Sequence, residues 1–142
     1  MTTIDPILPV RGKVIASLKA DSALAALVGT RIYPSKVPAD VLWPFVRLDG
    51  MTSTPYRVDG SSGGEVSGIL HNFVKLDTSH PDPEASCARI NAAMVRILDA
   101  IDVVELGNGQ SMSVEVTLSQ VIPDSAEADA YHGAVRFEAL AL

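Results

Sequence analysis

Apolar residues recur at helical spacing near the start of the chain. Four of them stand three or four positions apart: Ile7, Val10, Val14 and Leu18. This spacing predicts an amphipathic helix over residues 7–20. A second, shorter helix is expected at residues 22–28, because Asp21 suits an N-cap and Gly29 suits the left-handed position that ends a helix.

Alternating apolar and polar residues predict extended segments in the middle and in the last part of the chain. The expected strands are 31–33, 45–49, 65–78, 112–122 and 131–142. The strand at 45–49 is expected to stop at Gly50. In the strand at 112–122, one face is expected to point into the core, and that face carries Met112, Val114, Val116 and Leu118.

The segment between residues 51 and 64 has a different composition. It is rich in Gly, Ser and Thr and contains Pro55, a mixture that neither helices nor strands prefer. We expect a long mobile loop at 51–64. Loops of this length are usually functional.

The strongest helical pattern lies at residues 84–101 and follows a proline-rich turn. Its predicted inward stripe consists of Cys87, Ile90, Met94, Ile97 and Ile101, and its predicted outward positions are Arg89, Asn91, Arg96 and Asp99. We expect this helix to lie across a sheet, with Ile90, Met94 and Ile97 buried against it.

The elements occur in the order α-α-β-β-β-α-β-β, with helices and strands largely segregated. This order predicts an α+β fold, in which a largely antiparallel sheet of about five strands is covered on one face by helices. The opposite face of the sheet is expected to have mixed cover. A chain of 142 residues fits a single domain over 1–142.

Composition and charge narrow the possible functions. Hydrophobic residues make up 47% and charged residues 20%, which is typical of a packed globular fold. The formal net charge is -6 and the Lys and Arg residues form no run, so a phosphate-binding basic face is not expected. No apolar run approaches the roughly 20 residues that span a bilayer. Because residues 1–9 do not resemble a signal peptide, we expect the protein to stay in a cytoplasm.

The residues that usually carry chemistry do not form known sites. The three histidines, His71, His80 and His132, lack zinc-site spacing, and Ser61–Gly64 lacks the Lys of a phosphate-binding loop. The acidic segment with Asp124, Glu127 and Asp129 lacks the spacing of a calcium loop. Cys87, the single cysteine, is expected in the core. The sequence therefore predicts no catalytic, cofactor or metal site, and no enzyme.

Tyr56, Arg57 and Asp59 are the candidate partner-interface residues. Tyr and Arg carry much of the binding energy at protein interfaces, and these three residues fall within the predicted loop. The alternative interpretation is a loop tip in solvent, and composition alone does not decide between the two.

Several short motifs, taken together in this order, resemble a known family. They are Ala23–Gly29 followed by Arg31–Tyr33, then Pro44–Leu48, then His71–Leu76 leading into the helix, and finally Tyr131–Phe137. Over roughly residues 7–140 the chain resembles phage and prophage tail completion proteins, which are related in fold to tail terminators. No catalytic motif contributes to this resemblance.

The resemblance implies a structural virion subunit in the tail, made in the host cytoplasm during assembly. It implies a ring, hexameric in this family, that completes the tail tube and joins it to the head. The expected partners are further copies of the chain, the tail tube protein and head–tail connector proteins, while DNA passes through without being bound. Two alternatives stay open: a head-side connector or stopper of the same joint, and a small-molecule-binding or enzymatic α+β domain.

Overall fold

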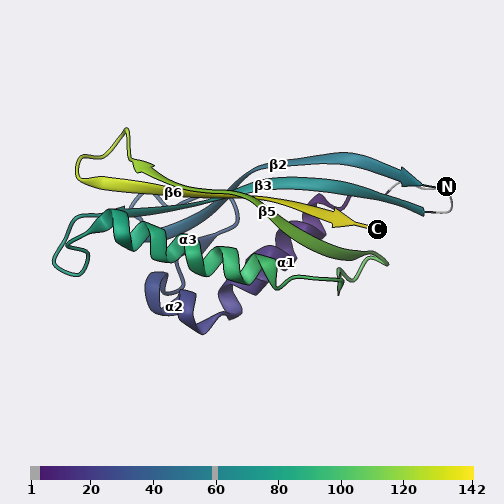
Figure 1. Cartoon of the computed structure of the whole chain (residues 1–142), viewed down its shortest axis with the longest axis horizontal. Coiled ribbons are helices and arrows are strands. Elements are labelled where there is room, and N and C mark those ends of the chain that lie inside the picture. Colours follow the sequence, from purple (N-terminus) through teal and green to yellow (C-terminus); the bar gives the residue numbers. More distant parts are fainter. Residues whose placement is uncertain (1–3, 59–60) are drawn as a thin grey trace.

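Three helices pack on one side of a six-stranded sheet in the computed structural model, which describes residues 4–58 and 61–142 (Figure 1). The helices are α1 (Ile7–Ala20), α2 (Ser22–Val28) and α3 (Pro83–Asp99). The strands are β1 (Ile32–Tyr33), β2 (Phe45–Val58), β3 (Ser61–Lys75), β4 (Val104–Glu105), β5 (Ser111–Pro123) and β6 (Ala130–Ala141).

The first two helices begin and end where the sequence predicts, whereas α3 begins one residue earlier and ends two residues earlier than the predicted 84–101. The Asp21 carboxylate accepts a hydrogen bond from the Leu24 backbone N–H at 2.9 Å, which caps α2, and Gly29 ends it with a φ of 60°. Asp82 caps α3 in the same way, immediately before Pro83 at the first helical turn. None of the helices within the described ranges is long and apolar enough to cross a membrane.

The sheet has the strand order β1-β2-β3-β6-β5-β4, in which only β1 and β2 pair in parallel. The α+β class is confirmed, and the sheet is one strand larger than expected. The additional strand β4 pairs with β5 where Val104 lies opposite Met112. A two-residue strand is too short to show an alternation of apolar and polar positions, so the sequence pattern does not reveal it.

Residues 51–58 and 61–64 belong to the distal part of a long β2–β3 hairpin, so the irregular loop expected at 51–64 is wrong for these described residues. Strand β2 continues past Gly50 because a register shift between Asp49 and Thr52 absorbs the irregular backbone. Gly63 lies so close to the backbone carbonyl of Ala141 that no side chain fits. At this position glycine reflects close packing of strands and not a flexible turn.

The core lies between the helices and the inward face of β2, β3 and β6. Cys87, Ile90, Met94 and Ile97 are buried on α3, which confirms the predicted stripe. Asn91 was expected to face outward, and this expectation is wrong because its side chain is buried. It accepts a 2.6 Å hydrogen bond from the Asn72 amide and donates one to the Gln120 carbonyl at 3.0 Å. These bonds satisfy a polar group inside the core.

A second expectation, that Leu118 points into the core, is wrong because β5 contains a bulge. Val116 lies opposite Phe137, and the register shifts before Leu118, which lies opposite Arg136. The extra residue reverses the alternation of faces, so Leu118 points away from the core and is 45% exposed. Met112 is buried, whereas Val114 and Val116 are only partly buried.

Candidate interaction surface

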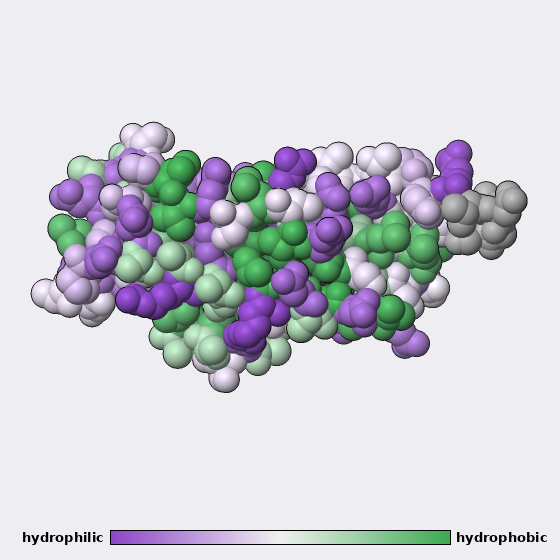
Figure 2. All heavy atoms as spheres, in the orientation of Figure 1, coloured by the Kyte–Doolittle hydropathy of each residue, from purple (hydrophilic) through white to green (hydrophobic). Residues whose placement is uncertain are grey.

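The helices leave one face of the sheet uncovered, and we call this side of β2, β3, β6 and β5 the open face (Figure 1). Exposed apolar side chains on these strands include Tyr56, Leu118, Ile122 and Leu140. In the view of Figure 2, apolar residues lie among polar ones over the visible side of the molecule. The two ends of the open face differ in chemistry, and each is described in turn.

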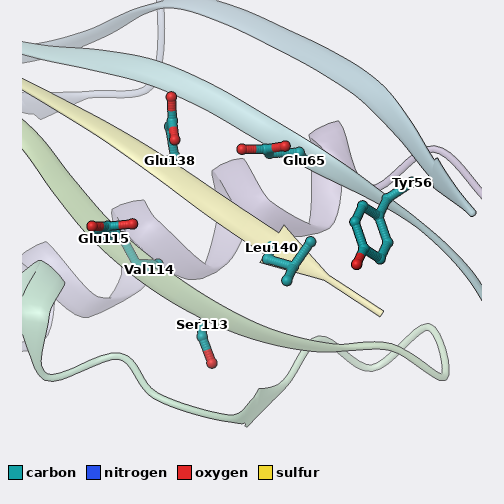
Figure 3. A pocket seen from close by; sticks show the side chains of 7 residues that line it. All are labelled: Tyr56, Glu65, Ser113, Val114, Glu115, Glu138 and Leu140. Atoms are coloured by element: carbon teal, nitrogen blue, oxygen red, sulfur yellow. The ribbon is translucent and has the colours of Figure 1, made fainter. Parts of the chain in front are cut away.

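The first end holds a shallow pocket of about 320 Å³, which we call the acidic pocket (Figure 3). Strands β2, β3, β5 and β6 all contribute to its lining, which consists of Tyr56, Glu65, Ser113, Val114, Glu115, Glu138 and Leu140. The pocket therefore combines apolar walls with three carboxylates.

The strand register explains why these carboxylates gather. Glu115 on β5 lies directly opposite Glu138 on β6. Glu65 on β3 lies opposite Leu140, two residues farther along β6 than Glu138. Like charges in opposite positions of a sheet destabilise it. Within the described ranges, no Lys, Arg or His side chain lies at ion-pair distance from these three carboxylates.

The second end of the open face carries a row of stacked rings, which we call the aromatic end. The ring centroids of Phe45 and Phe73 are 4.8 Å apart, and those of Phe73 and His132 are 4.5 Å apart. Trp43 meets Phe45 edge-on at 5.4 Å. Stacked and edge-on rings of this kind stabilise the sheet beyond the area they bury.

Two cations border the aromatic end. The Lys75 ammonium lies 4.6 Å from the centre of the Trp43 ring and 3.8 Å from a Glu127 carboxylate oxygen. The Arg47 guanidinium lies 6.0 Å from the centre of the Phe73 ring. The open face is thus acidic at one end, and aromatic with cations at the other.

The predicted interface residues do not stay together. Tyr56 lines the acidic pocket, whereas Arg57 follows it along β2 and so belongs to the opposite face of the strand. Asp59 lies outside the described residues. A role of these three residues in binding a partner stays a prediction.

Six of the acidic residues lie in two separate groups. Glu65 and Glu115 join Glu138 in the acidic pocket, while Asp124, Glu127 and Asp129 lie at the β5–β6 connection beside the aromatic end. Glu138 meets Glu115 only because β5 pairs with β6. Cross-strand register is the signal that sequence reasoning lacked.

The side chains most often involved in catalysis have structural roles here. Burial raises the pKa of the Cys87 thiol to about 12, so it stays protonated at neutral pH and is a poor nucleophile or metal ligand. His80 Nδ1 lies 2.9 Å from an Asp77 carboxylate oxygen in an exposed turn. In the described part of the chain, no three His, Cys, Asp or Glu residues gather in a way that would hold a metal ion.

The chain matches a known protein family and the known structures of virion and phage proteins. The family model of tail completion protein gp17 matches residues 12–141. A chain in the virion of a native gene transfer agent particle is 20% identical to this chain. The match covers 93% of each of the two chains, with a TM-score of 0.74. The gp17 protein of bacteriophage SPP1 is 18% identical over 95% of this chain and 89% of its own length, with a TM-score of 0.58. No curated protein sequence matches the chain.

Proposed function

The chain belongs to the tail completion protein gp17 family of virion structural proteins, and from this premise we propose that it forms a closed ring in a phage-like tail. In this proposal, six copies complete the end of the tail tube and join it to the head. Members of this structural family are not known as enzymes. The resemblance seen in the sequence motifs is confirmed by the family match.

The observation that carries the proposal is the uncompensated acidic pocket on the open face. Glu115 and Glu138 face each other across two strands at a cost to the isolated subunit. A ring that lets DNA pass must not hold the phosphates tightly, and carboxylates on the surface of the lumen repel them. We therefore propose that the open face borders the lumen of the ring.

The proposed partners are those that the family resemblance implies. The tail tube protein and the head–tail connector proteins would contact the two rims of the ring, and DNA would pass through it. The distal part of the β2–β3 hairpin, with Tyr56 and Arg57, is proposed to contact these neighbours. Assembly would take place in the host cytoplasm, and the finished ring would lie in the virion tail. If cryo-EM of a virion shows the chain on the head side of the joint, the chain is a connector instead.

Ring formation is tested by native mass spectrometry of the purified protein, alone and with the tail tube protein. We expect a discrete species at six times the 15.0 kDa mass of one chain, at least when the tube protein is present. A closed ring should give one sharp mass, since heterologous contacts that close leave no free binding surface. A chain that stays monomeric in both samples, or forms open polymers, contradicts the proposal.

The absence of DNA binding is tested by fluorescence anisotropy with duplex DNA at low salt. We expect no saturable sub-micromolar binding by the wild-type protein. The triple variant Glu65→Lys, Glu115→Lys and Glu138→Lys brings the formal net charge from -6 to zero and should bind DNA in a salt-sensitive way.

The matched control has the same charge change on the helix side of the molecule, in the triple variant Asp5→Lys, Glu84→Lys and Asp99→Lys. These three residues are exposed, Asp5 just before α1 and the other two on α3. If both triple variants bind DNA equally, net charge alone explains the effect and the lumen assignment fails. Tight wild-type binding would mean that folding assembles a basic groove.

A further inference from the structure

Two histidines form a direct hydrogen bond at the aromatic end of the open face. His71 lies on β3 and His132 on β6, and Nδ1 of His71 is 2.6 Å from Nε2 of His132. The register places His132 opposite Phe73, so the two histidines are diagonal neighbours across adjacent strands. Their ring centroids are 4.8 Å apart. This contact links the two central strands of the sheet.

The pair is held in place by its surroundings. His132 stacks on Phe73 with an angle of 18° between the ring planes, and both histidines are only partly exposed. His71 also lies near Phe73, with ring centroids 6.3 Å apart. The two imidazoles therefore have little freedom to separate without disturbing the aromatic row.

Charged groups reach the pair from several elements. Arg47 on β2 lowers the proton affinity of both rings, while Asp49 on β2 raises that of His71. Asp124, at the end of the β5–β6 connection, raises the proton affinity of His132. Lys75 lies two residues beyond Phe73 on β3 but forms its own ion pair with Glu127. The neighbouring carboxylates only partly offset burial and Arg47.

A hydrogen bond between two imidazole nitrogens needs one N–H donor and one unprotonated acceptor. It is compatible with two neutral rings, or with one protonated and one neutral ring. When both rings are protonated, both nitrogens carry hydrogen and the bond is lost. Two positive charges then stand side by side next to Arg47, which adds repulsion.

We propose that His71 and His132 form a proton-sensitive latch between β3 and β6, closed near neutral pH and opened in mild acid. Opening adds two positive charges to the aromatic end, where Arg47 and Lys75 are already paired with the carboxylates of Asp49 and Glu127. Any partner that docks on this end would then meet a different surface in acid. The latch does not depend on ring formation.

Both histidines have a pKa below the usual value, chiefly because burial disfavours the charged ring. The unfolded chain, with ordinary histidines, therefore takes up protons at a higher pH than the folded chain. As the pH falls through about 6.5, the unfolded state binds more protons and the folded state loses stability. The latch thus stabilises the fold above this pH and weakens it below.

The first test follows the imidazole signals of the wild-type protein by NMR between about pH 8 and pH 4.5. We expect His71 and His132 to titrate as a coupled pair in two steps, with the second step well below the ordinary histidine range. The signals of neighbouring aromatic rings should shift with that second step. Independent single titrations at the ordinary value, with no response from Phe73, would overturn the latch.

The second test compares melting temperatures at about pH 7.5 and about pH 5. The His71→Gln variant keeps a hydrogen-bonding side chain but never carries the charge, and His80→Gln is the control outside the pair. We expect acid to lower the melting temperature of the wild type and of His80→Gln by roughly 2–4 °C more than that of His71→Gln. An equal acid effect in all three proteins would contradict the proposal.

Discussion

The Met94→Asp variant should unfold at a far lower temperature than the wild type, or fail to fold. Met94 is fully buried on α3 and belongs to the hydrophobic core between the helices and the sheet. An unpaired buried carboxylate costs about 4 kcal/mol or more, a large part of the stability of a small domain. Thermal and urea unfolding followed by circular dichroism measures the loss.

Ala92→Asp is the matched control for this variant, since Ala92 is exposed on the same helix. There the new carboxylate stays in water, and only the lower helix propensity of Asp counts, about 0.5 kcal/mol. Equal melting temperatures for Met94→Asp and the wild type would show that α3 does not bury this stripe against the sheet.

The Asn91→Ala variant should lose about 2–3 kcal/mol of unfolding free energy, measured by urea denaturation. Asn91 joins α3 to two strands, through the side-chain amide of Asn72 on β3 and the backbone carbonyl of Gln120 on β5. Its removal leaves the buried Asn72 amide without this partner and takes one hydrogen bond from the Gln120 carbonyl. A loss below about 0.5 kcal/mol would mean that water replaces both bonds.

Gly133→Ala tests the same cluster from β6. A methyl group on Gly133 would lie 2.5 Å from the Asn91 side-chain oxygen and even closer to the Asn72 amide. We expect a loss similar to that of Asn91→Ala. The double variant should lose less than the sum of the two single losses, since Asn91→Ala removes one close contact and gives the Asn72 side chain room to move away from the methyl group. Gly12→Ala on α1 is the control, because nothing lies within 4 Å of its added methyl group. Strictly additive losses would refute the coupling.

Local patterns predicted the helices well because their signals are contained within a few residues. Asp21 and Gly29 act within one turn, and the apolar stripe of α3 repeats every three or four residues. Asn91 was misplaced because a polar residue on a helix normally faces water, and its buried partner Asn72 is 19 residues away. The bulge that turns Leu118 outward likewise depends on the partner strand.

The glycine-rich composition of residues 51–64 predicted a loop, and this prediction was wrong for a related reason. Gly63 looks like a loop residue in isolation, yet it is needed because the backbone of Ala141 passes beside it. The same limitation applies to the candidate surface. Tyr56 was singled out by residue type, but the carboxylates that surround it come from three other strands. Which residues meet across a sheet is decided by register, and single-sequence patterns carry little information on register.

The strand order has a consequence for how the protein is made. Strand β6 lies between β3 and β5 at the centre of the sheet, although it is the last of the described strands to leave the ribosome. Until it emerges, β3 and β5 each present an unpaired edge, which other nascent or misfolded chains can use for pairing. Because β3 and β6 are more than 50 residues apart in sequence, the contacts between these two strands form late in folding. Nonsense mutations upstream of Ala130 would thus leave an aggregation-prone product instead of a smaller working subunit.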